Sequence, residues 1–499
     1  MNITLARTGD FVGSGRGAAA LVGGSLTILF VLRIVLFPGI GGDEGEQLVF
    51  SQFFDWGYQV RNPPLITWLV IAVSQVTGPT AVAVAVVKIV ALGLMYTFLW
   101  KCALHVLQDA RLAALAAASP LTLYYIGWDA IFGYTHSILV TMFYVATLWL
   151  VIRIETRGKR RDFVWLGVVV AGGLLSKYVF AVFLLALLAA CAGDRTLRQR
   201  LFQPALLISL LVSTVLLFPH MMWLANTITL PDGGPLTGPK VSDVTHLIFA
   251  IIGFLSPFWL VVFGIFPTSI AARPDVATDE YRYATLLERY FLILCAVALV
   301  AIALFHNGRL RTHYMFILLP LIIYFFLKIK AAPPRHDRCQ LFGITLLVFA
   351  ALSIVGMVVK FVAEPLKCDR CQHHIPYQEL ASALRKAGFV RGTIVAYWHP
   401  DPIAGNLRIQ FKDSRVISTK HPMVQPPPGR HPGQCVLVWP VSDAKVGRGS
   451  TIAMANRYLG TSIPAQTSGK EVSAPLKMGR GKQVALGYIL VNSGAGTCR

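Results

Sequence analysis

Charged residues are scarce in this chain. They make up only 14% of its 499 residues, against about a quarter in typical soluble domains. Hydrophobic residues reach 55%, and several apolar runs have the roughly 20 residues that a helix needs to cross a bilayer. This composition excludes an ordinary soluble protein and predicts an all-α polytopic membrane protein.

Several familiar functional signatures are also missing. Cys368-Asp-Arg-Cys371 has no second cysteine pair at zinc-finger spacing, and no Gly-rich nucleotide loop of the usual spacing occurs. The net charge of +21 comes without a basic stripe interleaved with aromatic residues, so nucleic acid is not an expected partner. Lys and Arg gather instead in short loops between apolar runs, which is typical of cytoplasmic loops in membrane proteins.

The distribution of Lys and Arg predicts the orientation of the chain. No small-residue cleavage site follows the first apolar run, so we expect a cytoplasmic tail at 1–17 and a retained first span. The polar loop 39–63 then lies outside, and the segment 64–78 forms an interfacial helix or the start of a span. We expect about eleven spans, at 18–38, 79–100, 112–127, 136–152, 163–193 (two helices), 202–224, 247–270, 289–305, 313–328 and 341–361.

Residues 163–193 are expected to form a hairpin. Basic loops flank this apolar segment on both sides, and one helix cannot begin and end on the same side of a membrane. The turn is expected near Gly172-Gly173 and Ser176-Lys177. An ionisable residue such as Lys177 is costly in a membrane hairpin and is by default functional.

The polar end of the chain, 363–499, predicts a small periplasmic α/β domain beyond a transmembrane domain at 18–362. A helix is expected at Tyr377–Gly388, and strands at Thr393–Trp398, Arg415–Ser418, Cys435–Trp439 and Val484–Val491. No catalytic motif appears there, so we interpret the domain as accessory or acceptor-facing. One or two disulfides are expected in an extracytoplasmic region, with the pairing open among Cys368, Cys371, Cys435 and Cys498.

The first outer loop concentrates acidic residues. Asp43, Glu44 and Glu46 lie within four positions, whereas capping a helix needs only one such side chain. A carboxylate held at the membrane face can accept a proton, or it can bind Mg²⁺ or Mn²⁺. Two arginines, Arg309 and Arg311, lie on another outer turn, against the positive-inside trend, and this favours an anionic ligand such as phosphate.

These segments resemble one known family of membrane enzymes. Gly42-Asp43-Glu44 after a first span, Asp55-Trp56-Gly57-Tyr58, Pro63-Pro64-Leu65 and Ser176-Lys177-Tyr178 are similar, in order and spacing, to the bacterial GT-C glycosyltransferases. That group includes protein O-mannosyltransferase-like enzymes, aminoarabinose transferases of lipid A and rhizobial lipopolysaccharide galacturonosyltransferases, and the last are the most similar. The resemblance covers about residues 20–330.

The resemblance implies an activity and a place in the cell. A sugar would move, with inversion, from a polyprenyl phosphate to lipid A, lipopolysaccharide or another envelope acceptor. The reaction would take place at the periplasmic face of the bacterial inner membrane. The sugar, the acceptor and the oligomeric state are left open by the sequence.

The resemblance also assigns roles to residues. Asp43, Glu44 and Asp129 are the expected catalytic residues, and Asp43 and Glu44 would hold a metal if one is used. Pro63-Pro64 replaces the Lys-Pro of aminoarabinose transferases, so phosphate binding is expected to fall to Lys177, Arg61 or Arg311. The expected substrate contacts are Tyr58, Glu46, His313 and Tyr178, with Glu46 in a supporting role.

Two other classes of function are compatible with the sequence. Ionisable residues within membrane segments also occur in secondary transporters, although no internal repeat is visible and the polar residues gather at one face. A non-catalytic envelope-assembly protein acting through 364–499 is the other alternative.

Overall fold

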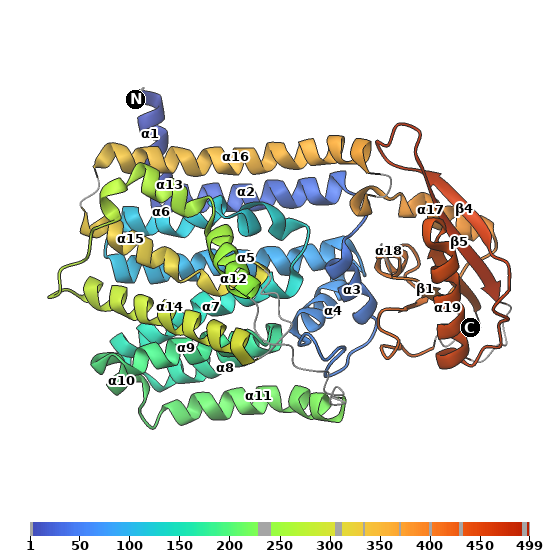
Figure 1. The fold of residues 1–499 in the computed structure, drawn as a ribbon, viewed down its shortest axis with the longest axis horizontal. Helices are drawn as coiled ribbons and strands as arrows, with labels where there is room; N and C mark the ends of the chain where they lie inside the picture. The colour runs from blue at the N-terminus through green and yellow to red at the C-terminus, as the bar shows by residue number, and fades with distance from the viewer. Residues whose placement is uncertain are drawn as a thin grey trace.

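The computed structural model describes residues 3–227, 241–304, 312–332, 335–368, 371–398, 402–428, 433–491 and 497–498. Figure 1 shows a body of long helices with a smaller region of mixed helices and strands at one end. The strands all belong to this smaller region, which follows the last long helix.

Six of the described helices are long and apolar enough to cross a membrane. They are α2 (Gly15–Leu36), α5 (Ala81–Leu107), α7 (Thr135–Arg157), α11 (Leu206–Thr227), α14 (Asp279–Leu304) and α16 (His336–Lys367). The bent pairs α9 (Phe180–Ala192) with α10 (Arg195–Leu201) and α12 (Val241–Leu255) with α13 (Phe258–Ile265) would raise the number to eight. The expected number of about eleven spans stays a prediction.

Two expected spans are interrupted. In the segment 112–127, α6 (Ala110–Ala118) is followed by the short turns η1 (Ser119–Thr122), η2 (Tyr124–Trp128) and η3 (Asp129–Ile131). In the segment 313–328, η5 (Thr312–Leu318) precedes α15 (Leu321–Ala331). Pro120 and Pro320 lie at these breaks, and proline cannot donate the backbone hydrogen bond that would continue a helix. The expected tail also contains a helix, α1 (Ile3–Val12), that the sequence did not predict.

The segment 163–193 forms two helices, as expected, but the turn is shorter than predicted. Helix α8 (Arg160–Ser176) ends just before Lys177, and α9 begins at Phe180. Gly172 and Gly173 lie inside α8, so their prediction as a turn is wrong. A Cβ atom at Gly173 would lie 2.5 Å from the ring of Phe180, which shows that this glycine permits close packing.

The C-terminal region is a five-stranded mixed sheet with helices on both faces. Strand order is β2-β1-β3-β5-β4, with β1 parallel to β2 and β3, and β5 antiparallel to β3 and β4. The strands are β1 (Gly392–Ala396), β2 (Arg415–Ser418), β3 (Gln434–Pro440), β4 (Lys470–Pro475) and β5 (Gln483–Val491). All four predicted strands are present, whereas β4 was not expected.

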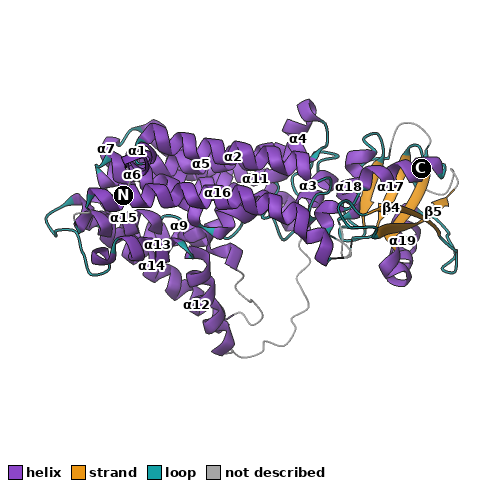
Figure 2. Cartoon of the chain, turned by 90° about the horizontal axis from the view of Figure 1, so that it is seen from above, coloured by secondary structure: helices purple, strands orange, loops and turns teal. Residues whose placement is uncertain are grey.

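Alternate side chains of the sheet build two separate cores. Ile394 and Val436 face α17 (Tyr377–Lys386) and α18 (Ile403–Gln410), whereas Val395 and Leu437 face α19 (Ala444–Leu459). Figure 2 shows the sheet between these helices. Val49 and Phe50 of α3 (Gly42–Phe50), together with Tyr58, complete the core under α17 and α18. The first outer loop therefore shares a hydrophobic core with the C-terminal region.

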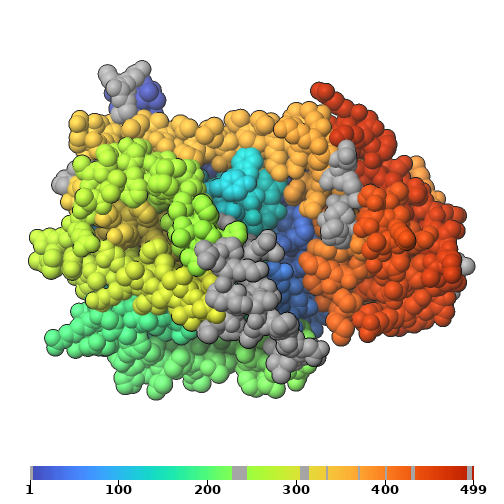
Figure 3. Space-filling model, in the orientation of Figure 1, coloured from blue at the N-terminus to red at the C-terminus, as the bar shows by residue number. Residues whose placement is uncertain are grey.

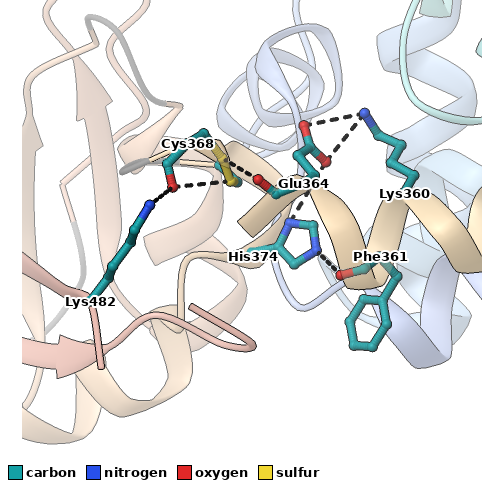
Figure 4. The surroundings of a disulfide bond; sticks show 7 residues. Lys360, Phe361, Glu364, Cys368, His374 and Lys482 are labelled. Atoms are coloured by element: carbon teal, nitrogen blue, oxygen red, sulfur yellow. Dashed lines mark hydrogen bonds and ion pairs between the residues drawn. A yellow bond between two sulfur atoms is a disulfide. The ribbon is translucent and has the colours of Figure 1, made fainter. Parts of the chain in front are cut away.

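Two disulfides resolve the pairing that the sequence left open. Cys368 pairs with Cys371 directly after α16, and Cys435 of β3 pairs with Cys498. Figure 4 shows the first of these, where Lys482 Nζ donates to the Cys368 carbonyl oxygen at 3.1 Å. The disulfide closes the turn after α16, and the hydrogen bond connects that turn to the loop before β5.

Candidate active site

The acidic loop is anchored by Glu44, which lies in a buried ion triad. Its carboxylate is 2.8 Å from Arg33 of α2 and 3.2 Å from Lys88 of α5, and all three side chains are at most 4% exposed. Burial alone would raise the pKa of Glu44, but the charges of Arg33 and Lys88 lower it to about 2. Glu44 is therefore ionised, and its carboxylate is directed into the protein.

This arrangement does not fit a metal ion shared by Asp43 and Glu44. Both oxygens of Glu44 already contact cations, so they cannot join Asp43 as ligands. Among the described residues, no group of three His, Cys, Asp or Glu side chains is arranged to hold a metal. We derive no catalytic step through a metal.

Asp43 instead faces a polar cavity of about 860 Å³. The cavity lies where the first outer loop, the start of α7, the break between α8 and α9, and the loop after β2 meet. Figure 3 shows the C-terminal region packed directly against this end of the helical body. The lining residues are Asp43, Glu46, Gln59, Arg61, Asn62, Tyr134, His136, Ser137, Lys177, Tyr178, Val179, Tyr314, Lys420 and His421.

Asp43 is positioned by Tyr134. The backbone N–H of Tyr134 donates to Asp43 Oδ2 at 3.1 Å. Tyr134 precedes α7 with a φ of 58°, a left-handed conformation that is costly for a bulky residue and often occurs at functional sites. Its hydroxyl hydrogen-bonds to Asp129, which does not line the cavity. Burial raises the pKa of Asp129, although Tyr134 and Lys360 oppose this change.

Cations line the cavity together with Asp43. Lys177 is only 8% exposed; its Nζ donates to Ser137 Oγ and lies 4.8 Å from the centre of the Tyr314 ring. Arg61 is exposed and also lines the cavity. The cavity therefore combines a carboxylate with cations, and such a set can activate a hydroxyl and stabilise a leaving phosphate.

Glu46 belongs to a second charged cluster, which involves the C-terminal region. Its carboxylate accepts from Gln59 at 2.7 Å, from Lys420 at 2.9 Å and from His421 at 2.8 Å. Burial alone would raise the pKa of Glu46, but the hydrogen bond and charge of His421 and the charge of Lys420 lower it to about 2. Glu46 thus connects α3 to the loop after β2 and remains ionised.

Two apolar grooves adjoin the polar cavity. One, of about 320 Å³, lies among α9, α12, α14 and η5, and it shares Val179 and Tyr314 with the cavity. The other, of about 490 Å³, lies among α8, α9 and α11 and shares Tyr178. A ligand with a charged head and a hydrocarbon tail could therefore occupy the cavity and a groove together.

The structure brings together half of the residues predicted for the site. Five line the cavity, namely Asp43, Glu46, Arg61, Lys177 and Tyr178. Glu44 and Asp129 do not line it, and Tyr58 packs on Phe50 while its hydroxyl donates to the Phe53 carbonyl at 2.8 Å. Tyr58 therefore does not line the cavity, and its contact with substrate stays a prediction. Arg311 and the side chain of His313 lie outside the described residues.

Several lining residues were missed by the sequence interpretation. His136 lies at the start of an apolar span, where a polar residue is an available signal of function. The same signal marks Arg33 and Lys88, which are single charges within apolar runs. Lys420 and His421 carry no such signal, because they lie among the polar residues of the C-terminal region.

Comparisons with known proteins define the class of this fold. The chain has the GT-C fold: it aligns with the structure of ArnT from Cupriavidus metallidurans bound to undecaprenyl phosphate, with a TM-score of 0.61 and 14% sequence identity. The alignment covers 94% of this chain and 97% of that one. The apo state of the same ArnT gives the same TM-score at 13% identity.

Sequence comparisons point to particular relatives. Residues 61–223 match the family described as dolichyl-phosphate-mannose-protein mannosyltransferase. The chain is 26% identical over 495 residues to the lipopolysaccharide core galacturonosyltransferase RgtA of Rhizobium johnstonii, covering 95% of this chain and 97% of that protein. RgtB of the same organism is 26% identical over 492 residues, with the same coverage. The resemblance inferred from the sequence motifs is confirmed: this multi-pass membrane protein is similar to membrane glycosyltransferases of the GT-C type.

Proposed function

We propose that this protein is an inverting glycosyltransferase that moves a sugar from a polyprenyl phosphate to a lipopolysaccharide or lipid A acceptor. The reaction takes place at the periplasmic face of the bacterial inner membrane. The observation that carries the proposal is the polar cavity with Asp43 and Lys177 in its wall, beside an apolar groove that shares Val179 and Tyr314 with it.

Asp43 acts as the base. The acceptor hydroxyl attacks the anomeric carbon while Asp43 takes its proton, and the bond from that carbon to the phosphate oxygen breaks on the opposite face. The polyprenyl phosphate leaves with the bonding electrons. Its developing negative charge is stabilised by Lys177 and Arg61, which line the same cavity. Inversion follows because attack and departure occur on opposite faces of the sugar.

The lipid part of the donor lies in the groove among α9, α12, α14 and η5. This groove is almost wholly apolar in its lining and meets the cavity beside Lys177, at Tyr314. A polyprenyl chain placed there puts its phosphate near Lys177 without burying the charge in hydrocarbon. The similar structure of ArnT is bound to undecaprenyl phosphate, which supports this class of donor.

The sugar and the acceptor are proposed from the relatives. RgtA and RgtB are named lipopolysaccharide core galacturonosyltransferases, and the chain is similar to both over nearly its whole length. A hexuronic acid is therefore the first sugar to test, with a lipopolysaccharide core as the first acceptor.

The test is transfer by the purified protein in proteoliposomes, measured by mass spectrometry of the acceptor. Wild type should extend the acceptor, and Asp43→Asn should abolish transfer because the amide cannot take the proton. The variant should insert and unfold like wild type, since Asp43 is exposed and outside the buried triad. Near-normal transfer by Asp43→Asn would remove Asp43 from the base role.

A further inference from the structure

We propose that Lys420 of the C-terminal region binds the carboxylate of an acidic sugar in the cavity, which makes that region part of the active site. This inference rests on the proposed glycosyl transfer and assigns a specificity-determining residue to it. The sugar carboxylate can belong to the donor or to the acceptor, and the experiment below separates the two.

Lys420 is held at the cavity wall with its ammonium group accessible. It follows β2, and its Nζ lies 2.9 Å from Glu46 and 4.3 Å from the centre of the Trp398 ring. The Lys420 side chain is nevertheless 40% exposed, against 12% for His421, and Lys420 lines the cavity. A cation packed on an aromatic face has a restricted position, which suits recognition of a fixed anionic group.

Glu46 does not depend on Lys420 alone for its hydrogen bonds. Gln59 donates to one carboxylate oxygen of Glu46, and His421 donates to the other. An ammonium group has three N–H donors, and only one of them is needed for Glu46. Lys420 therefore has donors to spare for a ligand.

Cations other than Lys420 are available to bind the donor phosphate. It lies beside Lys177, because the apolar groove meets the cavity at Val179 and Tyr314. Arg61 lines the same cavity and is a second cation for the phosphate. Among the described lining residues, Lys420 is the remaining Lys or Arg, and a hexuronic acid adds one more negative charge than a neutral hexose.

Hydrogen bonds hold the C-terminal region firmly against the acidic loop. Asn406 of α18 exchanges hydrogen bonds with the backbone of Ile40, and Gln52 exchanges hydrogen bonds with the backbone of Val416 in β2. These contacts hold the start of the loop after β2 against α3. A residue that recognises a substrate needs such rigid support.

The experiment compares Lys420→Met with wild type in proteoliposomes. Methionine keeps much of the side-chain length and removes the charge. Lys420→Arg tests rescue, and Lys412→Met is the matched control, because Lys412 is an exposed lysine of the same region that does not line the cavity. Each protein is given a polyprenyl-phosphate hexuronic acid or the corresponding neutral hexose, with an acidic or a carboxyl-reduced acceptor.

A donor role predicts that Lys420→Met raises KM for the uronosyl donor by roughly 10- to 100-fold, as expected for a lost charged hydrogen bond, with a small change in kcat. The neutral donor should be unaffected, and Lys420→Arg should recover most of the loss. An acceptor role predicts a loss with both donors that disappears with the carboxyl-reduced acceptor.

Two results would overturn the assignment to Lys420. One is unchanged kinetics with every substrate, and the other is an equal loss with all four substrate combinations, which indicates a structural role. A wild-type protein that transfers no sugar at all would instead count against the proposed function, so the two failures are distinguishable.

Discussion

Replacing Glu44 with glutamine tests whether buried charge holds the acidic loop in place. In the wild type, Glu44 compensates two cations, Arg33 and Lys88, that are 2% and 3% exposed. Glu44→Gln keeps the size of the side chain but leaves both cations buried without a counter-charge. Removing one member of a buried ion pair typically costs about 3–5 kcal/mol, because the remaining charge is no longer compensated.

The pKa of Glu44 gives a similar magnitude. The ordinary value is 4.5 and the folded value is about 2, and at 1.36 kcal/mol per pKa unit this difference corresponds to roughly 3 kcal/mol of stability at neutral pH. Because the folded pKa is the lower one, this stability is fully present above about pH 4.5. It is lost as the pH falls toward 2, where the folded carboxylate takes up a proton.

Lys88→Met is the matched comparison. It removes the ion pair between Lys88 and Glu44 and one hydrogen bond to the Ile131 carbonyl, but it leaves the Arg33–Glu44 pair intact. Because no buried charge is left without a counter-charge, the cost should be smaller, about 1–3 kcal/mol. Thermal unfolding in nanodiscs, followed by tryptophan fluorescence at pH 7 and at pH 3, measures the order of stabilities. The gap between wild type and Glu44→Gln should narrow at pH 3. A Glu44→Gln protein as stable as wild type, or less affected than Lys88→Met, would refute the reasoning.

Two further predictions concern how the site is held. Tyr134→Phe and Asp129→Asn should each lower kcat by a similar factor, because Asp129 acts on the cavity through the Tyr134 hydroxyl. The double variant should lose no more of kcat than either single variant, and additive losses in transfer kinetics would contradict this. Gly405→Ala should destabilise the protein and reduce transfer, because the new Cβ would lie 2.2 Å from Gly45 Cα and push α18 away from α3. Gly449→Ala in α19, where nothing lies within 4 Å, should unfold at about the wild-type temperature.

Much of the fold followed from patterns that hydropathy and charge report directly. The first span, the hairpin at 163–193 and the four predicted strands were found at nearly their expected positions. Hydropathy failed where an apolar run is broken, because Pro120 and Pro320 interrupt helices without lowering the apolar character of the segment. It also failed for β4, whose residues are mostly exposed and polar and therefore lack the alternation of a half-buried strand.

The candidate site was predictable where the chain carries its own local signal. Asp43 and Lys177 are ionisable residues at or within membrane segments, and both line the cavity. Lys420 and His421 reach the same cavity from nearly 400 residues further along the chain than Glu46. Such a juxtaposition depends on packing of the C-terminal sheet against α3, which no local pattern encodes.

The acidic loop shows why neighbouring residues of one motif can have different roles. Helix α3 directs successive side chains about 100° apart, so Glu44 cannot face the ligand that Asp43 and Glu46 face. Asp43 and Glu46 are three residues apart, on one side of the helix, and both line the cavity. Glu44 faces α2 and α5 and meets the two isolated cations of those spans. Glu46 faces the C-terminal region and meets Lys420 and His421. Asp43 also faces the cavity, where it accepts a hydrogen bond from the Tyr134 backbone N–H and forms no ion pair with any described residue. Its carboxylate can therefore accept a proton from a substrate.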